Sequence, residues 1–484
     1  MATRAVDDDV LVAVCNGSLT EPQARQFARQ SSEIIAFTLL AVAARVAAPG
    51  HGRGDDARGP HTPSGSVPPY AKPETSAAGS RRRRGKPGAR PGHAGHHRPR
   101  PVEIDQHRSH KLPCCPDCGG RLDRTGDTRT RVTEDIPEDL RPQVTEHTIH
   151  RDWCPKCRRR VEPRLPDVLP HCQVGNRVLV LSALLHFLNG CTLSQITSVF
   201  NFHLRLKITE GGLVQMWHRL AELLWDWYDQ IHQSCLDAAV LHADETGWRV
   251  RGQTHWLWCF GTRDATYYMI ERSRGHPALD KFFIEEFSGT LVTDFWAAYD
   301  AVGCAAHQRC WPHLLRELKA VDESGAGDDW PSFARRLRRV YGDAIKLSTQ
   351  HGRMPLEDYE VAIARLEGRL IELAVTDWTQ ADARRLASRL YKYDGQLLTF
   401  LWNESVPSDN NHAERSIRPA VLIRKNSYAN QSDRGALTQA VLMSVFRTLK
   451  QRGLNPIDTI LKALTCYATT GKLPALPVKS LPSN

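Results

Sequence analysis

Two aspartates in this chain each end a short apolar segment. Asp244 ends the segment that begins at Val240, and Asp294 ends the segment that begins at Thr290. A carboxylate at the end of a buried strand loses hydration unless a positive group meets it. Two such carboxylates on neighbouring strands favour a divalent cation, because Mg²⁺ prefers oxygen ligands. Each aspartate taken alone is also compatible with an ordinary turn or helix-capping role.

A third acid lies in the sequence D-N-N-H-A-E-R-S-I-R-P. We expect Asp409 or Asn410 to cap a helix that Pro419 then bends, with Glu414 just after its start. Glu414 therefore has two interpretations. It joins the two aspartates as a third acid, or it forms an ordinary i,i+4 ion pair with Arg418.

Two C-P-x-C tetrapeptides, separated by 35 residues, are a second group suited to chemistry. They contribute Cys115, Cys118, Cys154 and Cys157, whereas Cys114 lies outside the repeated pattern. Each tight turn lets two thiolates reach one ion, and two turns complete a tetrahedral Cys₄ zinc site. The alternative is a redox-active thiol pair. A zinc held by four cysteines has no open position for catalysis, so the predicted Zn²⁺ is structural, in a module that is structural or DNA-binding.

The interval between the cysteine pairs exceeds the roughly 15 to 20 residues of a compact zinc ribbon. It contains two segments of strand-like composition, Thr128–Thr133 and Gln143–His150. We expect these segments to supply the strands of the module, which spans residues 101–170.

Charge and composition narrow the class of protein. The formal net charge is +10 and the isoelectric point is about 9.0, which favours a polyanionic partner such as nucleic acid. No apolar stretch is long enough for a membrane span. Asp7, Asp8 and Asp9 stand where a secretory signal carries basic residues, and the 13 cysteines are an odd number. These features predict a cytoplasmic, nucleoid-associated protein without a disulfide framework.

The chain begins with two segments that carry no catalytic motif. Residues 1–48 are expected to form one or two short helices, and residues 49–100 form a Pro- and Gly-rich linker. The end of this linker is a basic tract without acids, which suits a phosphate backbone but is equally compatible with a solvated charge run. The tract begins with Arg81, Arg82, Arg83, Arg84 and Lys86.

Changes in periodicity mark the elements that must position the acids. Residues 171–237 have helical spacing and form either a helix-turn-helix or two ordinary packed helices. Residues 238–450 begin with strand patterns, and 321–404 are helical. Residues 451–484 form a final helix and tail. The predicted fold class is therefore multidomain, with a small zinc module, a helical region and an α/β core that contains an all-α insertion.

The strand patterns have a recognisable order. Strands are predicted over Val240–Asp244, Thr254–Thr262 and Ala265–Glu271, followed by a helix over Pro277–Phe287 and a strand over Thr290–Asp294. Three consecutive strands, a helix and a further strand are the opening order of a ribonuclease-H-like sheet.

Six ordered motifs resemble the DDE transposase of the insertion sequence 66 family of bacterial mobile elements. They are C-P-D-C-G-G, H-A-D-E-T-G-W, V-T-D-F-W-A-A-Y, C-W-P-H-L-L-R-E-L, D-N-N-H-A-E-R-S-I-R-P, and R-K-N followed by S-D-R-G-A. The resemblance runs from about Gly85 to about Leu449. The family commonly begins with a leucine-zipper-like helix, whereas residues 1–48 show no sustained heptad.

The resemblance implies a catalytic triad of Asp244, Asp294 and Glu414. Such a triad holds two Mg²⁺ or Mn²⁺ ions, one for the nucleophile and one for the leaving oxygen. Cys310 and His313 match a C-x-x-H signature of the interval before the glutamate, as possible auxiliary residues without a deduced role.

The implied function is cleavage at the ends of an insertion sequence and joining of the freed 3′-hydroxyls to target DNA. The implied partners are element-end and target DNA, further copies of the chain on DNA, and small accessory proteins of the same element. Two alternatives stay open: a metal-dependent nuclease on the same fold, and a zinc-ribbon DNA-binding regulator without enzymatic activity.

Overall fold

The computed structural model describes residues 101–123, 128–137, 140–170 and 172–478. The helices predicted over 1–48, the linker over 49–100 and the whole basic tract from Arg81 to Lys86 lie outside these ranges. The chain divides into two compact units between Val132 and Thr133.

A short hairpin surrounds the second cysteine pair. It consists of β1 (Asp152–Cys154) and β2 (Arg159–Val161), paired antiparallel. The strand predictions for Thr128–Thr133 and Gln143–His150 are wrong, because neither segment is a strand. Strand propensity alone does not supply a pairing partner, whereas the C-P-K-C turn brings the two sides of the hairpin together.

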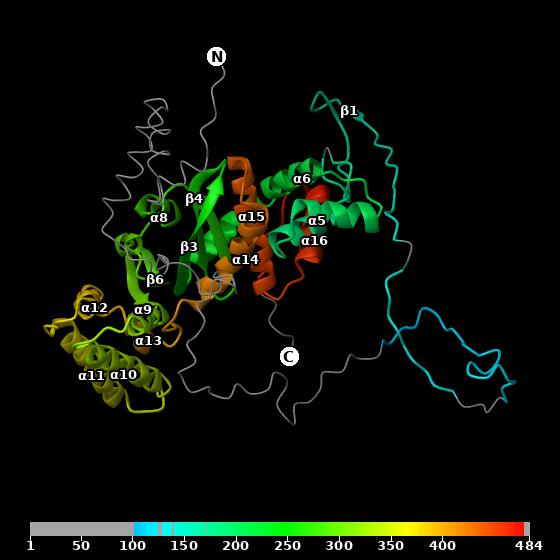
Figure 1. The fold of residues 1–484 in the computed structure, drawn as a ribbon. Coiled ribbons are helices and arrows are strands. Elements are labelled where there is room, and N and C mark those ends of the chain that lie inside the picture. The colour runs from blue at the N-terminus through cyan, green and yellow to red at the C-terminus, as the bar shows by residue number, and fades with distance from the viewer. Residues whose placement is uncertain (1–100, 124–127, 138–139, 171, 479–484) are drawn as a thin grey trace, which may run out of the picture. The chain divides into compact units, whose positions relative to one another are not determined.

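A mixed five-stranded sheet forms the centre of the second unit (Figure 1). Its strands are β3 (Val240–Val250), β4 (Gln253–Gly261), β5 (Thr266–Glu271), β6 (Phe287–Thr293) and β7 (Cys304–Arg309). The spatial order is β5-β4-β3-β6-β7, in which β3, β4 and β5 are antiparallel neighbours, while β6 runs parallel to both β3 and β7. Gly289 lets β6 approach β3, because a Cβ there would lie 2.5 Å from the carbonyl oxygen of Ala238.

Helices pack against this sheet. α14 (Asn411–Ser427) packs against β3 and β4, and α15 (Asp433–Gln451) packs against β5 (Figure 1). Hydroxyl groups of α15 also bind the backbone of β5, the strand at this edge of the sheet. Ser444 accepts from the backbone N–H of Tyr268 at 2.9 Å, and Thr448 accepts from that of Thr266 at 3.0 Å. Two donors of the edge strand are thereby satisfied without a further strand.

The opposite face of the sheet carries α8 (His276–Phe282) and the 3₁₀ turn η3 (Ala297–Ala301). Phe282 of α8 stacks on Phe260 of β4, and Tyr299 of η3 lies edge-on to Trp258. The sheet is therefore covered on both faces, as its apolar strands require.

The helices of residues 176–236 share a hydrophobic core with the sheet and with the last helix. They are α4 (Asn176–Phe187), α5 (Leu193–Ser198), α6 (Glu210–Leu223) and α7 (Trp225–Leu236), and the last helix is α16 (Pro456–Thr470). α4 contacts α16, α6 contacts α15, and α7 contacts β5. A π-helical turn, η2 (Val199–His203), follows α5 directly and leaves Phe202 79% exposed.

The insertion has a core of its own. Between β7 and α14 the chain forms α9 (Trp311–Glu323), α10 (Trp330–Ser348), α11 (Leu356–Val375), α12 (Ala381–Lys392) and α13 (Thr399–Trp402). The core residues of α11 are Tyr359, Ile363, Leu366, Leu370 and Leu373. Their alternating spacing of four and three residues places them on one face of the helix. None of the helices described is both long and apolar enough to cross a membrane.

We expect the protein to lose stability when the pH falls below about 6.5. Burial lowers the pKa of His186, which stacks on Trp217 in the α4–α6 core. Because its folded pKa lies below the unfolded value, the stabilisation is present above that value and is lost as the pH falls through the folded pKa. Thermal unfolding followed by circular dichroism between pH 7.5 and pH 5 should show a falling Tm, with a smaller fall in His186→Gln. The exposed His203→Gln is the control and should behave like wild type. A fall in Tm that is reduced more by His203→Gln than by His186→Gln would contradict the assignment.

Candidate active site

The pairing of β3 places Asp244 beside β6. The predicted strand end at Asp244 is wrong, because β3 continues to Val250 on the strength of its antiparallel ladder with β4. The parallel ladder with β6, however, ends at His242. Asp244 is therefore in the interior of its own strand but just beyond the end of the neighbouring ladder.

Asp294 directly follows the last residue of β6, as predicted. In the parallel register Leu241 pairs with Leu291 and His242 pairs with Val292. The same offset, continued two residues past the end of the ladder, matches Asp244 with Asp294, and the charge of Asp294 raises the pKa of Asp244. Asp294 is held by the backbone N–H of Trp296, which donates to its Oδ1 at 2.8 Å.

Glu414 lies in the first turn of α14, again as predicted. The N-cap of this helix is Asn410, and its side chain connects the helix to β3 instead of capping it. Asn410 is buried, its Nδ2 donates to the carbonyl oxygen of Ala243 at 2.8 Å, and its Oδ1 lies 3.0 Å from His242 Nδ1. Asn410 thereby fixes the start of α14 next to Asp244.

Like charges gather around Asp244. Burial raises its pKa well above the usual value, and Glu245, Asp294 and Glu414 raise it further. A group of carboxylates that repel one another at the end of a sheet is suited to a divalent cation, which would relieve the repulsion. The oxygen donors of Asp244, Asp294 and Glu414 fit Mg²⁺ or Mn²⁺ in their chemistry.

Glu245 belongs to the opposite face of the sheet. Its carboxylate accepts from Arg274 at 2.9 Å and from the hydroxyl of Tyr299 at 2.7 Å, and its side chain is 2% exposed. Burial and the charge of Asp294 raise the pKa of Glu245 to about 7, although Arg274 and Tyr299 act against the shift. The Arg274 guanidinium lies over the ring of Trp296 at 3.9 Å. This network stabilises the loop after Asp294 from the opposite face of the sheet.

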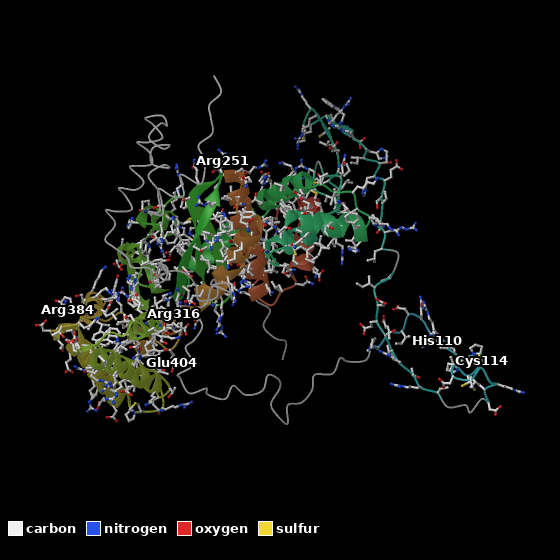
Figure 2. The ribbon with its side chains drawn as sticks, viewed as in Figure 1. His110, Cys114, Arg251, Arg316, Arg384 and Glu404 are labelled. Carbon is white, nitrogen blue, oxygen red and sulfur yellow. The ribbon has the colours of Figure 1, made fainter. Side chains whose placement is uncertain are left out.

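The carboxylate of Glu414 has a different environment. Its Oε1 accepts from Arg316 Nη2 at 2.7 Å and lies 3.7 Å from His313 Nε2. Arg316 belongs to α9 and lies between the sheet and the insertion helices (Figure 2). The ion pair of Glu414 is therefore made with Arg316 on another helix, not with the expected Arg418.

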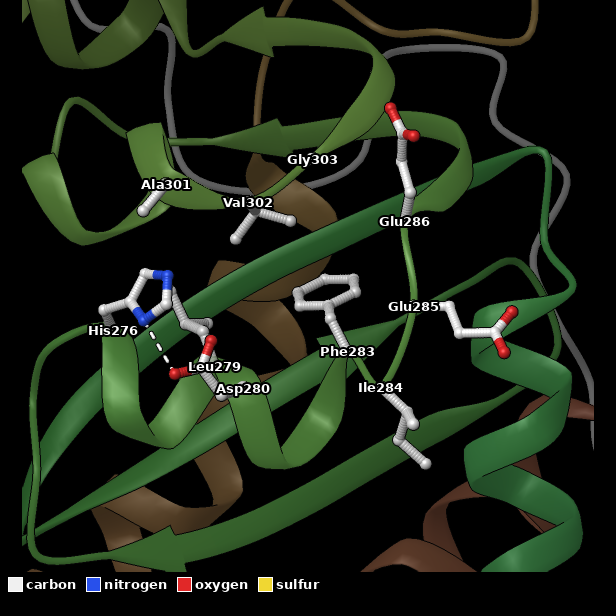
Figure 3. Close-up of a pocket in the computed structure, with 10 residues that line it drawn as sticks. All are labelled: His276, Leu279, Asp280, Phe283, Ile284, Glu285, Glu286, Ala301, Val302 and Gly303. Carbon is white, nitrogen blue, oxygen red and sulfur yellow. Dashed lines mark ion pairs between the residues drawn. The ribbon is translucent and has the colours of Figure 1, made fainter.

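A cavity of about 460 Å³ beside α8 does not include the three carboxylates (Figure 3). Its lining is partly apolar, with Phe283 and Ile284, and partly acidic, with Asp280, Glu285 and Glu286. Acidic groups repel phosphate, so this cavity is a poor site for nucleic acid.

The first C-P-x-C segment forms a tight turn. The backbone N–H of Cys115 donates to the carbonyl oxygen of Gly120, and that of Gly119 donates to the carbonyl oxygen of Cys115. Gly119 has φ +71°, which a glycine adopts without strain. Hydrogen bonds from the backbone N–H groups of Asp117 and Cys118 lower the pKa of the Cys115 thiol.

The second C-P-x-C segment repeats this pattern within the β1–β2 hairpin. The backbone N–H of Cys157 donates to Cys154 Sγ at 3.4 Å, and such bonds lower the pKa of the Cys154 thiol. Arg158 has φ +49°, at the position that Gly119 occupies in the first turn. Both turns therefore stabilise a thiolate, which is the form that binds metal.

Comparison with known families agrees with this arrangement. The model of the Transposase IS66 family matches residues 171–438, which is more than half of the chain. The chain belongs to the IS66 transposase family. A second model, the zinc-finger binding domain of transposase IS66, matches residues 113–158 and thus both C-P-x-C turns. Membership of this family implies DNA cleavage and transfer in general terms, and the zinc-finger match suggests Zn²⁺.

Relatives of this IS66-family chain occur in Sinorhizobium fredii (strain NBRC 101917 / NGR234). The uncharacterized protein y4qI is 23% identical over 236 residues, which cover 44% of each chain. The uncharacterized proteins y4hP and y4jD are 22% and 25% identical. Their matches cover 74% of this chain in both cases, and 72% and 75% of the respective relatives.

Two positioning residues of the site escaped the sequence analysis. Asn410 was considered only as a helix cap, and Arg309 was not considered at all. Arg309 is buried at the end of β7, and its guanidinium donates to the carbonyl oxygen of Asp294 at 3.0 Å and to Asp300 at 2.7 Å. It also donates to Gln396 of the insertion at 2.8 Å. The local sequence C-A-A-H-Q-R gives no signal for this role, because the partners of Arg309 come from distant segments of the chain.

We expect Arg309→Gln to loosen the insertion and the Asp294 loop together. Removing one partner of a buried ion pair costs about 3–5 kcal/mol. The loss here should lie near the lower value, because Asp300 is 27% exposed and keeps Lys392 as a partner. Urea unfolding of the variant against wild type measures the change. The exposed Arg339→Gln serves as control, and equal stability of wild type and Arg309→Gln would refute the assigned role.

Proposed function

We propose that this IS66-family protein cuts DNA strands at the ends of an insertion sequence and joins the freed 3′-hydroxyls to target DNA. The observation that supports the proposal is the parallel register of β3 and β6, whose offset, continued two residues past the end of the ladder, matches Asp244 with Asp294. Glu414 approaches the same end of the sheet from α14, and its charge raises the pKa of Asp244. This arrangement suits a phosphoryl-transfer enzyme with three carboxylates.

The strand order supports a ribonuclease-H-like fold as part of the proposal. Three antiparallel strands are followed by two parallel strands on the other side of β3, with α8 between the two groups in the chain. The helical insertion lies between β7 and α14. It therefore lengthens the sequence interval before the third acid, Glu414, although α14 still packs against the sheet. The boundaries predicted for the individual domains stay part of this proposal.

Asp244, Asp294 and Glu414 would hold two Mg²⁺ or Mn²⁺ ions. When bound, these ions activate the attacking oxygen and stabilise the leaving oxygen of an in-line displacement. Asp294 keeps its orientation through the N–H of Trp296, and Glu245 and Arg274 support that loop from the other face. Ligand atoms of the three acids do not all lie within 4.8 Å of one another in the described residues, so Glu414, which is partly exposed, would have to release Arg316 to join the two aspartates.

An exposed stripe on α14 leads away from Glu414 and suits a DNA strand. Arg415, Arg418, Leu422 and Lys425 are exposed at spacings of three and four residues, which place them on one side of the helix. We further propose that the basic tract Arg81, Arg82, Arg83, Arg84 and Lys86 neutralises phosphates, and that α5, η2 and α6 form a helix-turn-helix. Assembly of several copies on DNA, with small accessory proteins of the element, belongs to the same proposal.

A metal-dependent nuclease and a zinc-ribbon regulator are the competing functions. A nuclease would cut the same DNA without joining the 3′-hydroxyl to a second molecule. A regulator would bind element ends but remain inert with Mg²⁺ or Mn²⁺.

We expect Asp244→Asn, Asp294→Asn and Glu414→Gln each to abolish cleavage and joining of element-end DNA while end binding persists. Loss of residues behind a metal ligand lowers metal affinity or activity by about 10–100-fold, so loss of a ligand itself should exceed about 100-fold. Double variants should be scarcely worse than single ones, because the residues act as one unit. Gel assays of strand cleavage, strand joining and end binding measure the three properties.

Glu372→Gln and Glu404→Gln are matched controls on the insertion, since both acids are exposed there. Retained cleavage in Glu414→Gln together with loss in either control would assign the third acid to the insertion. Normal cleavage in all five variants would contradict the assignment of these acids as the catalytic residues.

We also propose that Cys115, Cys118, Cys154 and Cys157 bind one structural Zn²⁺. The two similar turns and the family match over residues 113–158 support this proposal. Elemental analysis of purified protein should find this zinc, and a Cys118→Ser, Cys157→Ser variant should contain one zinc per chain less. Cys114→Ser, outside the repeated pattern, should leave the content unchanged. Equal zinc in wild type and the double variant would rule the assignment out.

A further inference from the structure

Cys310, His313 and Glu414 lie close together beside the acidic site. Each offers one ligand atom, and these three atoms all lie within 4.8 Å of one another. Among the residues that the structure describes, no other group of three or more acids, cysteines and histidines meets this condition. We propose that these side chains form a separate binding site for a thiophilic divalent cation such as Zn²⁺, which shares only Glu414 with the Mg²⁺ site.

The two ends of the insertion create the cluster. Cys310 is the N-cap of α9, and His313 follows within the first turn, so both side chains lie on one side of the helix start. At the other end of the insertion the chain returns to the same point, where Trp311 N–H donates to the carbonyl oxygen of Ser408. The backbone N–H of Asn410 then donates to Cys310 Sγ at 3.2 Å. This contact brings the first turn of α14, and with it Glu414, to the Cys–x–x–His pair.

The donor set selects the kind of ion. A thiolate, an imidazole and a carboxylate are ligands that Zn²⁺ binds, with water as the fourth ligand, whereas Mg²⁺ prefers oxygen ligands alone. Cys310 is buried, but the side chains of His313 and Glu414 are 26% and 34% exposed. An ion can therefore enter past His313 and Glu414 and reach the sulfur at the bottom of the site.

Arg316 now provides the positive charge at this place. Its Nη2 lies 2.7 Å from Glu414 Oε1 and 3.5 Å from His313 Nε2. A guanidinium only donates hydrogen bonds, so in this contact His313 Nε2 is on the acceptor side. The Arg316 side chain is 48% exposed and can move into solvent when an ion binds. Arg316 thus competes with the metal for Glu414. Replacing Arg316 should therefore strengthen metal binding, whereas replacing a ligand should weaken it.

Sharing of Glu414 has a functional consequence, which rests on the proposed function. A Zn²⁺ ion bound to Cys310 and His313 holds Glu414 away from Asp244 and Asp294. Zn²⁺ should therefore oppose strand cleavage that depends on Mg²⁺. The binding site itself does not depend on this consequence.

Co²⁺ tests the site directly, because a thiolate bound to Co²⁺ produces a charge-transfer absorption band. The full-length protein, carrying the zinc it retains on purification, is titrated with Co²⁺, and the band and the bound metal are measured. Wild type should bind one equivalent more than His313→Asn and Cys310→Ser, while Arg316→Gln should bind more tightly. Cys304→Ser is the matched control, since this sulfur on β7 contacts the carbonyl oxygen of Ala306.

The same band and stoichiometry in wild type and His313→Asn would overturn the site. His313 is partly exposed, so its replacement keeps the test valid even where Cys310→Ser fails to fold. Unchanged or weaker Co²⁺ binding in Arg316→Gln would contradict the competition between arginine and metal.

Cleavage assays at constant Mg²⁺ and increasing Zn²⁺ test the consequence. Each protein is compared with its own rate without added Zn²⁺, and His313→Asn should need at least about tenfold more Zn²⁺ for half inhibition. Equal inhibition of wild type and His313→Asn would overturn the antagonism. Absence of wild-type cleavage with every metal would contradict the proposed function instead, and the Co²⁺ result would still decide the site.

Discussion

Repulsion between carboxylates at one end of the sheet is the constraint on which the rest of the structure depends. Asp244 lies within β3, Asp294 directly follows the parallel strand β6, Glu245 lies on the other face, and Glu414 belongs to the first turn of a helix. Such a group is unfavourable in a folded chain unless cations or hydrogen-bond donors compensate it. Three arginines lie around the acids: two bind a carboxylate of the group, and the third binds the backbone carbonyl oxygen of Asp294. They are Arg274, Arg309 and Arg316.

Each arginine carries a distinct part of this task. Arg274 binds Glu245 behind the sheet and lies against Trp296, so it fixes the loop that follows Asp294. Arg309 is buried and joins that loop to the helical insertion. Arg316 is exposed and binds the partly exposed carboxylate of Glu414. The ion pairs of Arg274 and Arg309 are thus internal, whereas the ion pair of Arg316 with Glu414 lies where a metal ion can enter and replace the arginine.

The insertion has a structural reason for its position. It leaves the sheet after β7 and returns before α14, and both ends meet at Cys310. A long insertion with its own core is tolerated where its ends are close, because the loop-closure cost rises only slowly with length. Placing it before Glu414 couples the third acid to the packing of α9. That coupling makes Cys310 and His313 neighbours of an active-site candidate, although about one hundred residues of chain separate them from it.

The sequence by itself determined which residues are the candidates for chemistry. Strand-end aspartates, a glutamate after a helix cap and paired C-P-x-C turns are local patterns, and local patterns depend on side-chain type and spacing alone. The tertiary structure decided how these patterns meet. The register that aligns Asp244 with Asp294 depends on pairing between distant segments, and so does the continuation of β3 beyond Asp244. The partner of Glu414 was decided in the same way, since Arg316 reaches it across the ends of the insertion, and no periodicity within one helix encodes a contact between two helices.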